Sequence, residues 1–160
     1  MTIRPVGAWR LYAFGAVLLA ASGCQSATDV EVSDLDGTWA ATEARLEDLE
    51  GFKLGNIDLI AEGYNVAFSS PGDGTFTLIL DPPEGDPDYV TGTMEIDGTR
   101  ATFTTAANTT DGEVFYDPDD YQLALSITGG LTYDFSGNGV EVPAKLLVVM
   151  DRVSPEPAPL

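Results

Sequence analysis

From residue 63 onward, apolar and polar side chains alternate with a period of two. Val66 and Phe68 share one face of a short run, and Phe76 and Leu78 share one face of the next, after the glycine-containing residues 71–74. Successive side chains of a β-strand point to opposite faces, so this rhythm predicts strands with one buried and one exposed face. Such strands are typical of antiparallel sheets that close or fold over on themselves.

Turn residues separate the runs. Further runs of the same kind occupy residues 89–96, 100–105, 121–128 and 144–152, with a short one at 114–116. Asp97-Gly98 predicts a two-residue hairpin turn with positive φ at both positions. Gly129-Gly130 and residues 137–139 predict two further reversals, so eight or nine strands are expected without an intervening helix.

Residues 40–50 do not follow this rhythm. Their alanines, glutamates and leucines suit a helix that ends at Gly51 at least as well as they suit a strand. The residues alone do not decide between helix and strand for this segment, and the structure of residues 52–62 is equally undecided.

The chain begins with the features of a secretory leader. Arg4 and Arg10 precede an apolar run over residues 11–21, and this run is about half the length that a membrane-spanning helix needs. Small residues follow at once. Residues 1–23 are therefore predicted to be a signal peptide that is removed on export.

The residues Ala21-Ser22-Gly23-Cys24 resemble the lipobox of bacterial lipoproteins, although leucine is usual where Ala21 stands. The resemblance implies cleavage between Gly23 and Cys24 and acylation of Cys24, which would hold the protein on a membrane. Gln25 then favours the outer membrane, facing the periplasm or the cell surface. The alternative is ordinary cleavage that leaves Cys24 as an unmodified thiol.

Both ends of the remaining chain are expected to be loose. Residues 24–34 are predicted to form the lipidated N-terminus and a polar tether. Residues 154–160 contain three prolines, which lack backbone donors, so they are predicted to form a disordered tail.

Gly37 and Trp39 open the ordered part of the chain, and Arg152 lies in its last run. This arrangement resembles the lipocalin-like, or calycin, domains, in which a basic residue of the last strand packs across the tryptophan of the first. The resemblance implies that residues 35–153 form an all-β, antiparallel up-and-down barrel of about eight strands, with residues 40–48 in its first strand. Trp39 and Arg152 would then close one end of the barrel rather than contact a ligand.

The interior of an eight-stranded barrel is either filled by side chains or holds one small ligand. The side chains expected to face it, and to line any ligand site, are Val66, Phe68, Phe76, Leu78, Phe103, Leu123, Leu125, Tyr133, Leu146 and Val148. Such a lining suits an apolar or amphipathic molecule. A filled core is the other interpretation.

Charge and composition exclude several functions. Without residues 1–23 the chain has five basic and 26 acidic residues, a formal charge of −21 that repels nucleic acid. There is no histidine and no second cysteine, so no enzyme activity or cofactor is predicted. Residues 134–139 begin like a calcium loop, but Lys145 stands where a glutamate would complete it, so no metal site is predicted.

These observations predict a membrane-anchored, non-catalytic lipocalin-like lipoprotein of the cell envelope that binds a small apolar or amphipathic ligand. The alternative is an envelope interaction or scaffold protein with a filled core. In that case the acidic residues of 81–88 and 111–120, predicted to lie in loops, would contact a partner or bind calcium.

Overall fold

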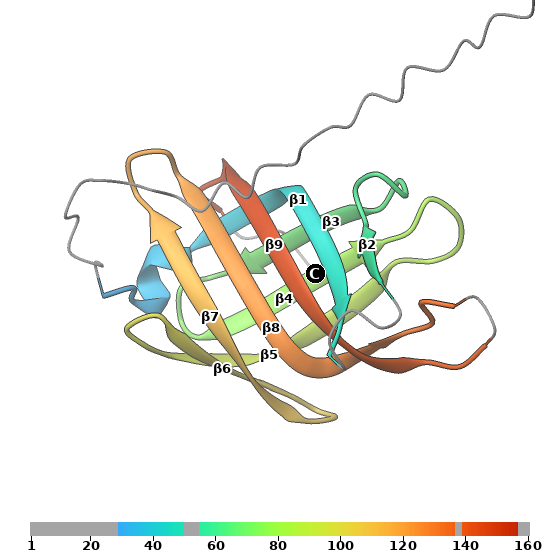
Figure 1. Cartoon of the computed structure of the whole chain (residues 1–160). Helices are drawn as coiled ribbons and strands as arrows, with labels where there is room; N and C mark the ends of the chain where they lie inside the picture. The colour runs from blue at the N-terminus through green and yellow to red at the C-terminus, as the bar shows by residue number, and fades with distance from the viewer. Residues whose placement is uncertain (1–28, 50–54, 137–138, 157–160) are drawn as a thin grey trace, which may run out of the picture.

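Antiparallel strands account for almost all of the regular structure in the computed structural model, which describes residues 29–49, 55–136 and 139–156 (Figure 1). The elements are the 3-10 helix η1 (Val32–Leu35) and the strands β1 (Gly37–Asp48), β2 (Asn56–Asp58), β3 (Asn65–Ser70), β4 (Thr75–Asp81), β5 (Asp88–Asp97), β6 (Arg100–Thr105), β7 (Thr109–Asp117), β8 (Gln122–Tyr133) and β9 (Val142–Ser154). Among these described residues, no helix has the length and apolar character needed to span a membrane.

Pairing between β1 and β9 closes the sheet into a barrel. Each strand from β3 to β8 pairs with the next one along the chain, β3 pairs with β1, and β1 pairs with β9 from Thr38 opposite Ser154 to Asp48 opposite Ala144. β2 pairs only with the second half of β1 and stands outside the ring. The structure is therefore an eight-stranded, antiparallel up-and-down barrel with one additional strand, which confirms the predicted fold class.

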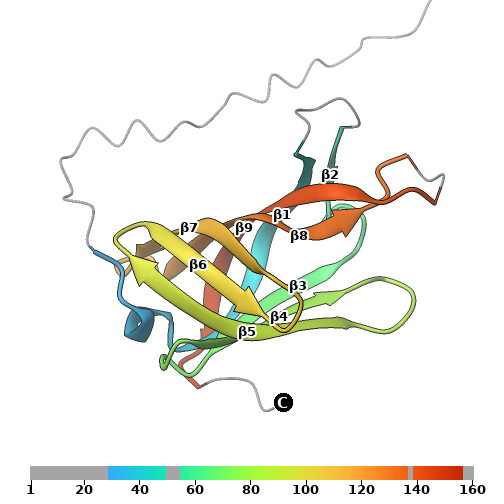
Figure 2. The ribbon, with the colours of Figure 1, turned by 90° about the horizontal axis from the view of Figure 1, so that it is seen from below.

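Because neighbouring strands run in opposite directions, their connections gather at two ends of the barrel (Figures 1 and 2). We call the end with η1 and the β3–β4, β5–β6 and β7–β8 connections the closed end. The other end has the β4–β5, β6–β7 and β8–β9 connections, and we call it the open end.

Residues 40–48 are extended in β1, as the resemblance to lipocalin-like domains implied, and the helical alternative is wrong. A bulge at Thr42 explains the ambiguous sequence: Ala41 pairs with Met150, whereas Glu43 pairs with the adjacent Val149. One inserted residue reverses the alternation of faces, so the period of two is lost at this point. Pairing on both sides of β1 overrides the helical propensity.

The predicted reversal at Gly129-Gly130 is wrong. β8 continues through both glycines, which have φ values of +89° and +76°, while Thr128 and Leu131 pair with adjacent residues of β9. The two glycines thus form a bulge, which needs positive φ values that glycine adopts without strain. An insertion of two residues keeps the alternation in phase, so Ile127 and Leu131 both contribute to the core.

The turn predicted at Asp97-Gly98 lies one residue further along. Asp97 pairs with Arg100, so the loop is Gly98-Thr99, and only Gly98 has a positive φ, of +64°. Glycine at the first loop position is the pattern of a type II′ hairpin, not of the expected type I′. The short strand predicted at residues 114–116 is also longer than expected, since β7 has nine residues.

The N-terminal part of the described chain lies on the closed end of the barrel. Val30 and Leu35 are buried, and the carboxylate of Asp29 lies close to Gly98. The described part of the predicted tether, residues 29–34, therefore lies against the folded domain. At the other terminus, Thr38 donates a hydrogen bond to the Glu156 carbonyl. The predicted signal peptide, the cleavage site at Gly23 and Cys24, and residues 157–160 lie outside the described residues.

Candidate functional site

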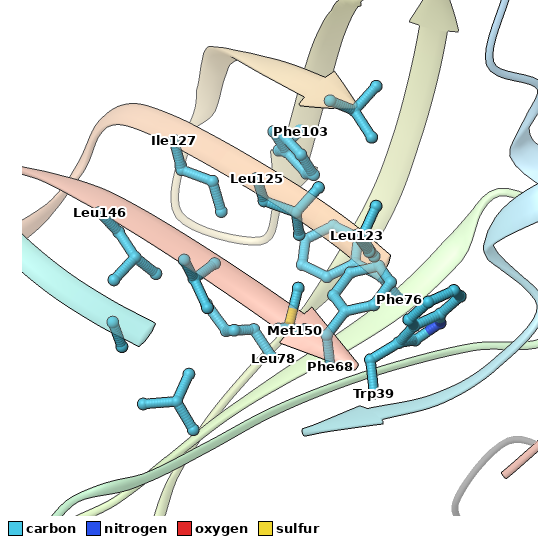
Figure 3. Close-up of a cluster of buried hydrophobic side chains, with 14 of the residues drawn as sticks. Trp39, Phe68, Phe76, Leu78, Phe103, Leu123, Leu125, Ile127, Leu146 and Met150 are labelled. Atoms are coloured by element: carbon cyan, nitrogen blue, oxygen red, sulfur yellow. The ribbon is translucent and has the colours of Figure 1, made fainter. Parts of the chain in front are cut away.

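Side chains from the strands fill much of the barrel interior (Figure 3). Nine of the ten side chains predicted to face the interior are at most 4% exposed, and the tenth, Tyr133, is partly buried against them. Whether any of them contacts a ligand stays a prediction. Their burial shows that this part of the barrel is a core.

Three phenylalanines form the middle of this core. The rings of Phe68 and Phe76 are stacked with centroids 6.1 Å apart, and Phe76 and Phe103 meet edge to face at 5.5 Å. The rings lie against strand backbone, because a Cβ at Gly92 would be 3.1 Å from Phe76 Cε1 and one at Gly112 would be 2.8 Å from Phe103 Cε2. The two glycines therefore make room for large aromatic side chains inside a narrow barrel.

Trp39 and Arg152 meet at the closed end, as the resemblance implied. They are paired across β1 and β9, and the Arg152 guanidinium carbon lies 5.5 Å from the centre of the indole, within cation–π range. Trp39 Nε1 donates a hydrogen bond to the Leu35 carbonyl at 3.1 Å, and Arg152 Nη2 donates one to the Asp36 carbonyl. The pair therefore fastens the segment around η1 across the end of the barrel.

Two neighbours complete this arrangement. A Cβ at Gly37 would lie 2.9 Å from Arg152 Nε, so glycine is required for the arginine to reach the indole. Tyr116 contacts Trp39 edge to face at 5.8 Å. Burial raises the pKa of Tyr116, while the positive charge of Arg152 acts in the opposite direction. The predicted signature of Gly37, Trp39 and Arg152 is thus brought together as a structural unit.

A pocket of about 320 Å³ opens to solvent at the open end of the barrel. Its apolar lining comes from buried residues of β4, β6 and β8, namely Phe76, Leu78, Phe103 and Ile127, and from the more exposed Val90 and Leu131. Polar groups stand at the edge, and we use the term rim for Thr105, Asn108 and Thr110. A mostly apolar concavity with a few polar groups is the usual form of a small-molecule site.

Hydrogen bonds hold the rim in place. Thr105 N donates to the Asn108 carbonyl at 2.8 Å, and the Thr105 hydroxyl donates to the Asn108 side-chain oxygen at 3.1 Å. The Thr110 hydroxyl donates to the Thr128 carbonyl across to β8. Asn108 lies over the glycine bulge, since a Cβ at Gly130 would be 2.9 Å from its amide nitrogen. The β6–β7 connection is therefore fastened above the pocket by its own polar groups.

Sequence reasoning found only part of this lining. Of the ten predicted lining residues, three line the pocket: Phe76, Leu78 and Phe103. The sequence did not predict the rim, because nothing in it indicated that the β6–β7 connection would contact β8. Gly129-Gly130, which leaves room for the Asn108 side chain, is the sequence feature that could have indicated this contact, but the pair predicted a chain reversal.

The acidic residues that the structure describes do not gather into one metal-binding group. Asp111 and Glu113 lie within β7 rather than in a loop, which corrects the prediction for that segment. The Asp134 carboxylate accepts hydrogen bonds from the backbone nitrogens of Ser136 and Gly139, at 3.1 and 2.5 Å, as in a turn. In the described part of the chain, no three histidine, cysteine or acidic side chains are grouped so that they could hold a metal ion.

Comparison of the sequence with models of known protein families finds no match, and comparison with curated proteins finds no relative. The class of protein therefore rests on the closed eight-stranded barrel, which is compatible with a lipocalin-like fold, and on the residues described above.

Proposed function

We propose that this chain is the precursor of a lipid-anchored, non-catalytic protein of the cell envelope that binds one small apolar or amphipathic molecule at the open end of its barrel. The observation that supports the proposal is the pocket of about 320 Å³ with an apolar floor and a fixed polar rim. The absence of histidine from the sequence favours binding over catalysis.

The size of the pocket limits the ligand. Its volume of about 320 Å³ is near the lower end of the usual range for small-molecule sites, roughly 300 to 1,000 Å³. A cavity of about 150 Å³ holds benzene, so this pocket suits a molecule of about a dozen non-hydrogen atoms. A short acyl chain or a two-ring compound has this size, and a full-length lipid does not fit completely.

The lipobox resemblance implies an anchor at Cys24, and with that anchor the position of Asp29 favours one end of the barrel as the end that faces the membrane. Asp29 is five positions after Cys24, so these two residues are at most about 18 Å apart in any conformation. Asp29 lies at the closed end, near Gly98. We therefore propose that the closed end faces the outer membrane and that the pocket faces the aqueous side, from which its ligand enters.

Binding can be tested on the mature chain without its leader. We expect saturable binding of 1-decanol, with loss of at least about tenfold in affinity when Leu131→Trp fills the pocket. Phe115→Trp is the matched control, because Phe115 is 51% exposed on β7 and is not part of the lining. Absence of saturable binding to the native chain, or equal binding by the two variants, would overturn the proposal.

The filled part of the barrel interior supports a second candidate, a rigid scaffold for an envelope partner. This candidate predicts that the native chain binds no small molecule and that Leu131→Trp has no effect. The same titration therefore separates the two functions.

A further inference from the structure

We propose that the pocket at the open end selects uncharged amphiphiles that carry a hydrogen-bond donor, such as a short alcohol or amide, and discriminates against carboxylates. The inference rests on the proposed function, because it names the chemical class of the ligand bound at that same site. It is carried by the hydrogen bonds of the rim and by the distribution of charge around the pocket.

Among the residues that the structure describes, no cationic side chain lines the pocket. Of its fifteen lining residues only Tyr89 is ionisable, and the others are apolar, glycine, threonine or asparagine. A carboxylate that enters such a site loses part of its hydration without gaining a positive partner. An uncharged head group loses less hydration free energy. A threonine or asparagine side chain can also make the hydrogen bonds that this head group made with water.

The rim hydroxyls are already committed as donors. Thr110 donates its hydroxyl proton to the Thr128 carbonyl, and Thr105 donates to the side-chain oxygen of Asn108. The Thr105 oxygen also accepts hydrogen bonds from the backbone nitrogens of Ala107 and Asn108, both at 3.2 Å. A hydroxyl has one proton and two lone pairs, so Thr110 is the rim threonine that presents an oxygen acceptor to a ligand. An alcohol or amide can donate to this oxygen, whereas an ionised carboxylate can only accept. The Asn108 amide supplies one neutral donor.

The electrostatic field of the whole molecule also disfavours an anionic ligand. None of the four basic side chains in the described part of the chain is among the lining residues: Arg100 follows the β5–β6 turn, Arg152 lies at the closed end, and Arg45 is on β1. Lys145 pairs with Thr128, but it alternates with the buried Ala144 and Leu146, which puts it on the outer face of β9. Arg45 is also 3.9 Å from the Glu47 carboxylate. With 26 acidic residues in the chain, anions are depleted at the mouth at low ionic strength.

The test compares two probes with the same ten-carbon tail, 1-decanol and decanoate, by calorimetric titration of the mature chain at pH 8. We expect decanoate to bind at least about tenfold more weakly than decanol. Added salt should reduce the decanol-to-decanoate ratio of affinities only in part, because salt screens the long-range electrostatic field but does not change the loss of hydration.

A variant with a cation at the mouth gives the positive test. Ala107 is exposed in the β6–β7 connection and lines the pocket, so Ala107→Lys is expected to fold and to narrow the decanol-to-decanoate ratio to less than about threefold. Ala107→Gln, which adds a similar length without charge, should leave the ratio unchanged. Equal or tighter binding of decanoate by the native chain would overturn the proposed selectivity. Failure of both probes to bind would instead overturn the proposed function.

Discussion

Replacing Trp39 with phenylalanine is expected to destabilise the barrel at its closed end. The substitution removes the indole N–H that donates to the buried Leu35 carbonyl at 3.1 Å. It also replaces the ring that faces Arg152 with a smaller one that attracts a cation less strongly. Trp39 is fully buried, so neither loss can be compensated by water.

The magnitude follows from these contacts. A buried carbonyl without its donor costs about 1–3 kcal/mol. The smaller ring leaves a cavity worth about 1 kcal/mol, and the weaker cation–π contact costs about 0.5 kcal/mol. We therefore expect Trp39→Phe to lower the free energy of unfolding by about 3 kcal/mol and the melting temperature by about 10 °C.

Urea and thermal unfolding of the mature chain measure both quantities. Phe115→Leu is the control, because this half-exposed side chain on β7 should change stability by less than about 0.5 kcal/mol. Ligand binding by Trp39→Phe should be retained at a temperature where the variant is folded. A loss of stability below about 1 kcal/mol would contradict the role assigned to Trp39 at the closed end.

Other perturbations test separate parts of the structure. Gly129→Ala and Gly130→Ala each put a side chain at positive φ and should cost about 1–2 kcal/mol in urea unfolding, whereas unchanged stability would argue against the bulge. Burial raises the pKa of Tyr116 and of Tyr133 above the usual 10.0, so the folded chain retains these protons longer and stability should fall as pH rises above 10. Tyr116→Phe and Tyr133→Phe should each make the loss of stability above pH 10 less steep. A pH profile of stability identical to that of the native chain would contradict the raised pKa values. Cys24→Ala should abolish palmitate incorporation in bacteria and release the protein from the membrane fraction, and continued labelling would refute the anchor.

The fold could be predicted from the sequence because most strands are amphipathic. Alternation at Val66 and Phe68, or at Leu123 and Leu125, depends only on local geometry, in which side chains of a strand face opposite sides. The closing pair of Trp39 and Arg152 was available only through resemblance, since nothing local links residues so far apart.

Bulges account for most of the errors. A one-residue insertion at Thr42 removed the alternation from β1, and the two-residue insertion at Gly129-Gly130 resembled a turn. A bulge is defined by the register with another strand, so the sequence of one strand cannot distinguish it from a break in the strand. The rim of the pocket depends on the same bulge, because Asn108 lies over Gly130, and it was missed for the same reason.

The most direct test of the account is to map where 1-decanol binds, by following backbone amide chemical shifts of the mature chain during a titration. The account predicts saturable shifts at the rim and the adjacent bulge, around Asn108 and Gly130, and none at the closed end around Trp39. Shifts confined to another surface, or no shifts up to the solubility limit of the alcohol, would contradict a ligand pocket at the open end of the barrel.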